Sequence, residues 1–543
     1  MNESVRWQWR VLGKKKIHLL FLTLIQAITG SIGVAYALLL RSVVDGAVAG
    51  DRVVFWRSMI LMAAAVSLHL ILAAVYRWLL ELTRASFENV LKERLFGTIL
   101  RKDFSAVSAT HTAEWLNRLT NDVRIVAEGS SDLVPGAVGT IIRLTSALTM
   151  MIVLEPGFAF ILIPGGLLMI LITLILRKGM KKLHKNVQES DGRLRIFLQE
   201  RIGHLMLVKA FSAERSAAEG AKDRMDAHKA ARMKRNRFSN FCHTGFGIAM
   251  QGMYLIGIFY CAYGILTGTV SYGTLTAVIQ LIGQIQSPLA NISGYLPRYY
   301  TMCASAERLM ESEAFADDSG SMEPEALREF YQNRFTALKL ENVTFAYPPE
   351  KAVNVLNQFS MELRKGEMLG FSGASGSGKS TVMKLLLCLY PVESGASLIN
   401  EEPLTAGYRR LFAYVPQGNA LMNGTIREVV SFARPEQAGE DEQLWEALRI
   451  ACADEFVMSL DMMLGEEGSG LSEGQMQRIA VARAIFSQAP ILLLDESTSA
   501  LDEKTEHALL SNIKKLTDKT VILITHRKAA LDFCDRVIEF HSS

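Results

Sequence analysis

A glycine-rich stretch in the last third of the chain has the residue types and spacing of a phosphate-binding loop. Residues Gly373 to Ser380, GASGSGKS, match the pattern G-x-x-x-x-G-K-[ST]. The preceding EMLGFSG is strand-like and the following STVMKLLLCL is helix-like, so a chance glycine-rich turn is the weaker interpretation. Lys379 would reach the β and γ phosphates, and Ser380 would bind Mg²⁺. The backbone N–H groups expected to hold phosphate oxygens belong to Ser375, Gly376, Ser377 and Gly378.

A second apolar run ends in two carboxylates. Residues Ile491 to Ser497, ILLLDES, predict a buried strand that ends at Asp495 and Glu496, at the sheet edge where ligands bind. We expect Asp495 to hold Mg²⁺, directly or through water, and Glu496 to act as general base toward an attacking water. The alternative is a pair of surface carboxylates, which the four preceding aliphatic residues disfavour.

A third candidate is the helix start at Leu471, in LSEGQMQRIAVARAI. Ser472 and Gln475 form an S-x-x-Q capping box, and a helix follows. Taken alone, this stretch indicates only a well-capped helix. An uncovered helix start is also an anion site, and the two motifs above favour that functional interpretation.

The totals indicate more than one domain and a membrane component. The chain has 543 residues, half of them apolar, with a formal net charge of +3, so nucleic acid is not an indicated partner. Its six cysteines form no C-x-x-C pair, which indicates buried thiols in a reducing compartment.

Six apolar segments precede these motifs, and each is about the ~20 residues that a membrane-spanning helix needs. Buried soluble helices are the alternative, which six such segments in succession make improbable. The segments are 17–40, 56–80, 133–154, 157–176, 244–266 and 272–296.

The charged residues between the segments predict the orientation. Lys and Arg gather before the first segment, after the second and after the fourth, whereas the turns LEPGF and TGTVSY have none. By the positive-inside rule, both termini and the two long connections are cytoplasmic; the mixed turn after the first segment is the weakest support. KKKIHLLFLTLI followed by AYA could be a cleaved signal peptide, but five remaining spans would place the nucleotide motifs outside the cell.

The connections between segments have structure of their own. Residues 81–131 and 177–243 have helical spacing, broken near the middle in a way that suits helical hairpins with a short helix at the tip. Residues 311–335 are acidic and polar and predict a linker, after which strand-like and helix-like stretches alternate. The expected domains are a transmembrane domain (1–310), the linker (311–335) and a nucleotide-binding domain (336–543).

Taken in order, the motifs resemble those of an ATP-binding cassette (ABC) domain. GASGSGKS, YVPQ with Gln417, LSEGQ, ILLLDE, STSALD and LITH with His526 correspond to its Walker A, Q-loop, signature, Walker B, D-loop and H-loop. With six preceding spans, nearly the whole chain resembles an ABC exporter half-transporter. The implied fold is multi-domain: an all-α polytopic membrane domain with six transmembrane helices, followed by an α/β P-loop cassette. NRLTNDV and LVKAFSAE are similar to the family's stretches near its two coupling helices.

The resemblance also implies roles for single residues. Tyr347 would stack on adenine, Gln417 would sense Mg²⁺ and the γ-phosphate, and His526 would bind the γ-phosphate. Asp502, in the D-loop, would link two sites, and Glu473 departs from the family's usual glycine, placing a carboxylate near phosphate. The residues expected at ATP are Tyr347, Gly373, Ser375, Gly376, Ser377, Gly378, Lys379, Ser380, Thr381, Ser472, Gly474, Gln475 and Asp502. Those expected to be catalytic are Glu496, His526 and Gln417, and those expected at the metal are Ser380, Gln417 and Asp495.

In that family the signature helix serves the nucleotide of a neighbouring chain, so the resemblance implies a dimer. We expect a second half-transporter, with a homodimer favoured and a heterodimer possible, in the lipid bilayer of the cell membrane. The expected function is ATP-driven export of a drug, lipid or peptide-like substrate. The alternative is a membrane-anchored ABC ATPase with a regulatory role.

Polar residues in the membrane segments are candidates for the substrate path. Gln280, Gln284, Ser287 and Asn291 are spaced 4, 3 and 4 apart and share one helical face. They would either line the path or form hydrogen bonds between helices. Arg143, in the third segment, would pair with a carboxylate or meet an anionic substrate or lipid headgroup.

Overall fold

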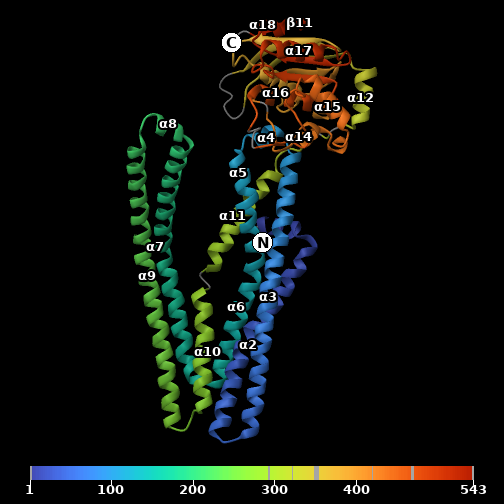
Figure 1. The fold of residues 1–543 in the computed structure, drawn as a ribbon. Coiled ribbons are helices and arrows are strands. Elements are labelled where there is room, and N and C mark those ends of the chain that lie inside the picture. Colours follow the sequence, from blue (N-terminus) through green and yellow to red (C-terminus); the bar gives the residue numbers. More distant parts are fainter. Residues whose placement is uncertain are drawn as a thin grey trace. The chain divides into compact units, whose positions relative to one another are not determined.

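The computed structural model of the chain describes residues 3–291, 294–318, 320, 322–347, 354–418, 420–465 and 470–540. It divides into two compact units (Figure 1). The first unit comprises residues 1–95 and 117–310, and the second comprises 96–116 and 311–543.

The first unit is helical, as the sequence predicts. The apolar segments lie in long helices, and four helical stretches of the described residues are long and apolar enough to cross a membrane: Gly13–Val48, Arg52–Arg101, Thr112–Leu154 and Glu214–Leu266. The long helices are α2 (Ile17–Val48), α3 (Arg52–Arg101), α6 (Val123–Leu154), α7 (Pro156–Gly203), α9 (Glu214–Leu266) and α10 (Tyr272–Asn291). The shorter elements are α1 (Glu3–Val11), η1 (Gly13–Lys16), η2 (Arg118–Asp122), α8 (Leu205–Ala210) and α11 (Tyr295–Glu313), which extends into the second unit.

Glycines let the helices of this unit approach closely. α2 packs on both α6 and α10. A Cβ at Gly30 of α2 would lie 3.0 Å from the carbonyl oxygen of Gly139 in α6. A Cβ at Gly33 would lie 2.7 Å from the amide of Gln284 in α10. Larger residues at these glycines would push the helices apart.

Of the two long connections, residues 177–243 form the helical hairpin that their spacing predicts. α7 and α9 form an antiparallel pair with the short helix α8 at its tip (Figure 1). The other break contains α4 (Phe104–Ser108) and α5 (Thr112–Asn117). Asp103 caps α4, because its side chain accepts a hydrogen bond from the Ser105 N–H.

The second unit is an α/β domain with two main sheets. The five-stranded sheet has the order β11-β3-β10-β9-β6 and its described pairings are parallel. The four-stranded sheet, β2-β1-β4-β5, is antiparallel, and β7 and β8 form a short pair. The strands are β1 (Ala337–Phe345), β2 (Leu356–Arg364), β3 (Met368–Gly373), β4 (Ser394–Ile399), β5 (Glu402–Pro403), β6 (Phe412–Val415), β7 (Gly424–Thr425), β8 (Met463–Leu464), β9 (Ile491–Asp495), β10 (Thr520–Ile524) and β11 (Arg536–Phe540).

Helices cover these sheets, and one of them lies in the segment expected to be a linker. The hydrophobic residues Leu327, Phe330 and Tyr331 of α12 are buried in the core of this unit. The helices are α12 (Pro324–Asn333), α13 (Lys379–Leu386), α14 (Ile426–Val430), α15 (Asp441–Ile450), α16 (Glu473–Phe486), α17 (Glu503–Lys514) and α18 (Lys528–Leu531).

The strand order brings the sequence motifs together. β9 and β10 are buried along their whole length, as expected for parallel strands covered on both faces. β3 and β9 both pair with β10, so the loop after β3 and the carboxylates at the end of β9 reach the same sheet edge.

Candidate functional site

The phosphate loop depends on three glycines that adopt positive φ angles. Gly373, at the end of β3, has a φ of 139°, and a Cβ there would lie 2.3 Å from the Phe540 carbonyl oxygen. Gly376 and Gly378 have φ angles of 82° and 98°, in the region that favours glycine. A Cβ on Gly376 would meet nothing within 4 Å, so the loop backbone is open to a ligand there.

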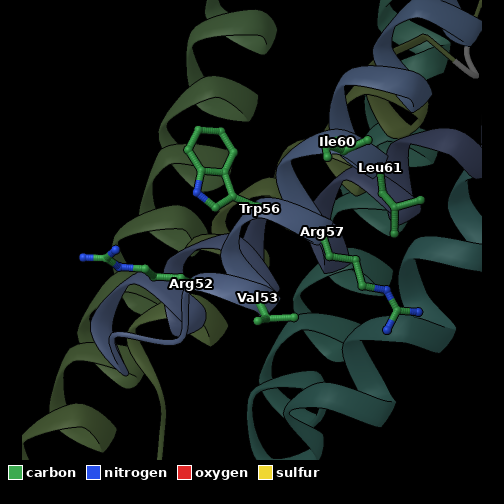
Figure 2. Close-up of a pocket in the computed structure, with 6 residues that line it drawn as sticks. All are labelled: Arg52, Val53, Trp56, Arg57, Ile60 and Leu61. Carbon is green, nitrogen blue, oxygen red and sulfur yellow. The ribbon is translucent and has the colours of Figure 1, made fainter.

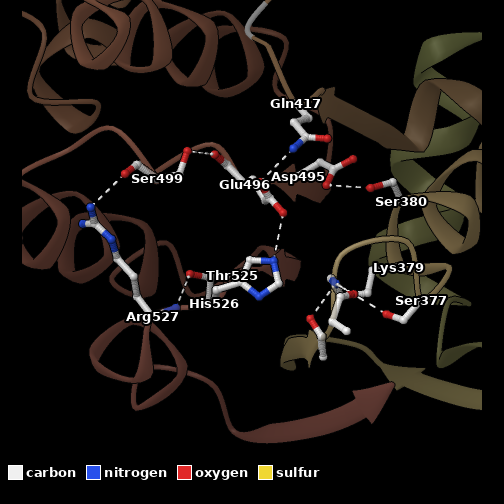
Figure 3. Close-up of polar contacts among 12 residues, drawn as sticks. Ser377, Lys379, Ser380, Gln417, Asp495, Glu496, Ser499, Thr525, His526 and Arg527 are labelled. Carbon is white, nitrogen blue, oxygen red and sulfur yellow. Dashed lines mark hydrogen bonds and ion pairs between the residues drawn. The ribbon is translucent and has the colours of Figure 1, made fainter. Parts of the chain in front are cut away.

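Lys379 lies folded into this loop. Its ammonium donates hydrogen bonds to the carbonyl oxygens of Gly373 (2.8 Å) and Ala374 (2.7 Å), and the residue is only 5% exposed (Figure 3). Burial lowers the pKa of Lys379, while nearby Glu496 and Asp495 raise it. Phosphate oxygens can replace these carbonyls as acceptors, so the lysine fits the predicted role.

Asp495 and Ser380 offer a site for Mg²⁺. The Ser380 hydroxyl donates to Asp495 Oδ1 at 3.0 Å, and the Tyr414 hydroxyl donates to Asp495 Oδ2 at 3.1 Å. Burial raises the pKa of Asp495, which is 1% exposed, although both hydrogen bonds lower it. A hydroxyl and a carboxylate are hard oxygen ligands, and Mg²⁺ usually takes few of them from the protein and keeps several waters. The residues therefore fit this ion.

Glu496 joins three of the predicted motifs. Its Oε2 accepts a 2.8 Å hydrogen bond from Gln417 Nε2, and its Oε1 lies 3.1 Å from His526 Nε2 (Figure 3). Its backbone N–H donates to the Ile524 carbonyl oxygen at 3.1 Å. The three residues predicted to be catalytic therefore meet around one carboxylate.

A supporting network around Glu496 carried no signal in the sequence. The Glu496 carbonyl oxygen accepts from the Ser499 hydroxyl at 2.9 Å and from Gln477 Nε2 at 3.4 Å. Arg527 donates to the carbonyl oxygens of Ser499 (2.8 Å) and Leu501 (2.7 Å). These bonds hold the turn that follows β9, and therefore the direction of the Glu496 side chain.

Tyr347 lies beside the phosphate loop with part of its surface exposed. Its hydroxyl is 3.1 Å from the Thr381 hydroxyl, and the Lys384 ammonium lies 5.5 Å from the centre of its ring. The Tyr390 ring packs edge-on against it, with centroids 5.2 Å apart. These contacts fix the tyrosine ring for the predicted stacking.

The signature residues form a separate group. Ser472 caps α16 and exchanges hydrogen bonds with Gln475, while Glu473 is the exposed first residue of that helix. A Cβ at Gly474 would lie 2.9 Å from the Ala500 carbonyl oxygen, so this position is packed too closely for a side chain. Asp502 caps α17 by accepting from the Thr505 N–H at 3.0 Å. Among the described residues, no hydrogen bond joins these five residues to the phosphate loop.

Two family models match the chain in the order that the motifs predict. The ABC transporter transmembrane region matches residues 19–289, and the ABC transporter domain matches residues 356–499. The chain belongs to the ABC transporter family.

The curated relatives are 30% identical to this ABC transporter chain over the aligned residues. The leukotoxin translocation ATP-binding protein LktB of Mannheimia glucosida is 30% identical over 384 residues, which cover 68% of this chain and 52% of that protein. LktB of Bibersteinia trehalosi is 30% identical over 357 residues, which cover 63% and 48%. The chain thus spans about half the length of the curated relatives it matches.

A solved structure shares the fold of both regions. A bacterial Atm1-family ABC exporter with ATP bound superposes with a TM-score of 0.79 at 20% identity, over 98% of this chain and 94% of that one. This similarity confirms the predicted fold class, an all-helical membrane domain followed by an α/β nucleotide-binding domain.

The polar face of α10 has a mixed role. Gln284 packs against Gly33, whereas the Oε1 of Gln280 is buried with no hydrogen-bond partner among the described residues. Ser287 lines a polar cavity together with Arg143. The side chain of Asn291 lies outside the described residues.

A shallow concave surface lies at the start of α3, and all its lining residues come from that one helix (Figure 2). Among the described residues, no second element lines it, so this surface does not enclose a ligand. Trp56 is exposed there between Arg52 and Arg57, whose side chains point to different sides. An amphipathic tryptophan with arginines at the end of a span is typical of the boundary between lipid and water. The lining residues are Arg52, Val53, Trp56, Arg57, Ile60 and Leu61.

Proposed function

We propose that the chain is one half of an ATP-driven exporter that moves a substrate across the cell membrane by alternating access. The observation that carries the proposal is the position of Glu496 between Gln417 and His526, beside a phosphate loop, in a chain whose other unit consists of apolar helices. A carboxylate in this position can take a proton from an attacking water.

Each predicted site residue has a separate role in binding or hydrolysing ATP. Lys379 and the loop N–H groups bind the β and γ phosphates, and Tyr347 stacks on the adenine. Gln417 orients the carboxylate of Glu496, and His526 contacts the γ-phosphate. Ser380 and Asp495, with Gln417 nearby, would hold Mg²⁺, which would supply positive charge to stabilise the phosphoryl group during transfer.

The active form is a dimer. Lys379 binds the nucleotide of its own chain. Ser472, Gly474 and Gln475 instead bind the phosphate of the nucleotide held by a second chain. The capped start of α16 provides the N–H groups and helix dipole for that role. Because this chain carries Glu496, His526 and Ser472, two equal chains would form two competent sites, which favours a homodimer over a heterodimer.

The nucleotide-binding domain and both termini face the cytoplasm. Supporting this orientation, lysines and arginines gather in the connections on that side, and ATP is available there. The substrate is a drug, a lipid or a peptide-like molecule. The names of the curated relatives describe translocation of a leukotoxin by those proteins.

The test is ATP hydrolysis and transport by the purified full chain in lipid vesicles. We expect Mg²⁺-dependent ATPase activity in the wild type and ATP-dependent uptake into vesicles with outward-facing cassettes. Hydrolysis without uptake of any compound that stimulates it would support the regulatory alternative. No hydrolysis by the dimeric chain would contradict the proposal.

A further inference from the structure

A polar cavity of about 460 Å³ lies within the first unit, among helices that are otherwise apolar. α2, α6, α10 and the start of α11 supply its walls. Its lining residues are Gln26, Gly136, Gly139, Thr140, Arg143, Ser287, Pro288, Gly294, Tyr295 and Arg298. This volume is in the range of small-molecule sites.

Two glycines line one wall of the cavity and leave room for the neighbouring polar side chains. A hydrogen bond between two of the lining residues holds their side chains in place. A Cβ at Gly136 would lie 2.9 Å from the Tyr295 hydroxyl, and a Cβ at Gly139 would lie 3.0 Å from Gln26 Oε1. The Tyr295 hydroxyl and the Thr140 hydroxyl are 3.0 Å apart, which ties α11 to α6. The site is therefore built into the helix packing.

Arg143 and Arg298 give the cavity a net positive charge. None of the lining residues is acidic. In the part of the chain that the structure describes, the guanidinium group of neither arginine forms a hydrogen bond or an ion pair; the Arg143 carbonyl oxygen accepts from the Ser146 hydroxyl. The carboxylate one turn before Gly136, Asp132, is already paired with Arg84.

Other arginines of this unit form ion pairs with carboxylates. Arg308 binds the buried Asp122, and Arg41 lies 3.5 Å from Asp45. The cavity itself is deep, since Gln26 lies ~13 Å along α2 from Ile17 at ~1.5 Å per residue. An arginine without a carboxylate at such a depth is costly, and this cost marks it as functional.

We propose that this cavity binds the anionic group of the transported substrate, with Arg143 and Arg298 as a clamp for a carboxylate, sulfonate or phosphate. The Gln26 amide and the Ser287 hydroxyl can donate further hydrogen bonds to the same polar molecule. The Thr140 and Tyr295 hydroxyls already donate, to the Gly136 carbonyl oxygen and to Thr140, and offer the molecule acceptor oxygens. The inference rests on the proposed export function only in naming the ligand a substrate; anion binding stands by itself. Of the alternatives for Arg143, it selects the anion over a structural carboxylate.

The test is direct binding of carboxyfluorescein, a small anionic dye, to the full chain in phosphatidylcholine nanodiscs, followed by fluorescence anisotropy. Arg143→Gln and Arg298→Gln should each weaken binding about 10-fold, because each removes a charge-assisted hydrogen-bond donor. Arg143→Lys should bind within about 3-fold of the wild type. The matched control is Arg57→Gln at the start of α3, outside the cavity, which should bind as the wild type does.

Further measurements decide the outcome. Equal binding by the wild type and both glutamine variants would overturn the proposal, as would equally tight binding of the cation rhodamine 6G. Gel filtration and ATPase activity report on folding; if the glutamine variants misfold, loss of the preference for the anionic dye in folded Arg298→Lys would also overturn it. Displacement of the dye by phosphatidylglycerol in the nanodisc would support the site and assign it to lipid headgroups; no displacement would assign it to water-soluble anions.

The result is separable from the proposed function. A chain that binds the dye through the arginines but hydrolyses no ATP would contradict the export proposal and support the anion site. A chain that hydrolyses ATP but binds the dye equally well without the arginines would support the export proposal and contradict the anion site.

Discussion

Glu496 has a backbone conformation that a glutamate seldom adopts. Its φ is 49°, in the left-handed region where a residue with a side chain is strained. The strain is held by hydrogen bonds on both sides of the residue, to Ile524 through its N–H and from Ser499 to its carbonyl oxygen. The sharp turn aims the side chain at Gln417 and His526 instead of continuing the line of β9.

Replacing this carboxylate should separate binding from hydrolysis. Glu496→Gln keeps the shape of the side chain but cannot accept the proton of water, so turnover should fall at least ~100-fold while ATP affinity stays within about 3-fold. Steady-state hydrolysis and equilibrium binding of a labelled ATP analogue measure the two effects. The exposed Glu503→Gln is the matched control and should retain turnover. Hydrolysis at the wild-type rate by Glu496→Gln would remove this residue from the mechanism.

Asp495 should make the stability of the metal-free protein depend on pH. Burial raises its pKa, so the folded state holds the proton to higher pH than the unfolded state does. The contribution of Asp495 to the free energy of unfolding is therefore largest below ~3.9, the pKa of an unfolded aspartate. This contribution is lost as the pH rises from there through the raised pKa of the folded state. Asp495→Asn should avoid that loss and melt about 2–4 °C above the wild type at pH 8 without Mg²⁺, for about 1 kcal/mol.

Thermal melts between pH 4 and 8 check this expectation, with the exposed Asp532→Asn as control. The difference between Asp495→Asn and wild type should grow with pH, and Mg²⁺ with ATP should stabilise only the wild type. A difference that shrinks as pH rises would contradict the assigned direction.

At the scale of elements, local sequence patterns predicted the helices and the motif loops but not the contacts between distant elements. GASGSGKS carries its own geometry, since its glycines are required where φ is positive. The antiparallel sheet β2-β1-β4-β5 was not predicted, because strand alternation does not specify partners. Gln477 bonds to Glu496 across 19 residues of sequence, and Arg527 bonds to Ser499 across 28, so no spacing rule predicts that they support Glu496.

The signature helix carries a trade-off at Glu473. A glutamate in the first turn of α16 stabilises the helix by ~0.3–1 kcal/mol through the helix dipole, but its charge would oppose a phosphate bound at the same helix end. Glu473→Gly should lower the KM for ATP several-fold and reduce thermal stability by ~1 kcal/mol. Glu503→Gly, at the first turn of α17, is the control and should lose stability without changing KM. An unchanged KM in Glu473→Gly would show that the carboxylate points away from the phosphate.

A chain of aromatic contacts links α4 to Tyr347, the residue proposed to stack on adenine, within the second unit. The Phe104 ring packs perpendicular to the Tyr390 ring at 5.7 Å, and the Ser108 hydroxyl is 3.3 Å from the Tyr390 hydroxyl. Tyr390 in turn packs on Tyr347. Tyr390→Ala should therefore raise the KM for ATP ~3–10-fold, since each aromatic pair contributes ~0.5–1.5 kcal/mol.

The control for that link is Tyr390→Phe, which keeps the ring contacts and loses only the hydroxyl. It should bind ATP nearly as the wild type does, and Phe104→Ala should have part of the effect of Tyr390→Ala. Equal KM values for Tyr390→Ala and Tyr390→Phe would show that the aromatic contacts do not position Tyr347.

At the scale of the whole molecule, the proposed function predicts that the two groups of nucleotide residues act together only with a second chain. Lys379, Ser380, Asp495 and Glu496 gather at the end of the parallel sheet, whereas Ser472 begins a different helix with no described hydrogen bond to them. In the proposed dimer, one chain alone would supply only one half of each site. Hydrolysis should depend on chain concentration when the dimer is diluted in detergent.

Mixing two inactive variants tests this arrangement most directly. Lys379→Ala removes the phosphate-loop half, and Ser472→Ala removes the signature half, so each homodimer has two defective sites. A mixed dimer combines an intact phosphate loop from one chain with an intact signature helix from the other, and one of its two sites is whole. Random pairing makes about half of all dimers mixed, so about a quarter of wild-type activity should return if the sites act independently. A mixture of Lys379→Ala with the double variant should stay inactive, because no pairing restores a site. If the first mixture shows no ATPase activity although two affinity tags demonstrate mixed dimers, the proposal that each site is shared between two chains and acts independently is contradicted.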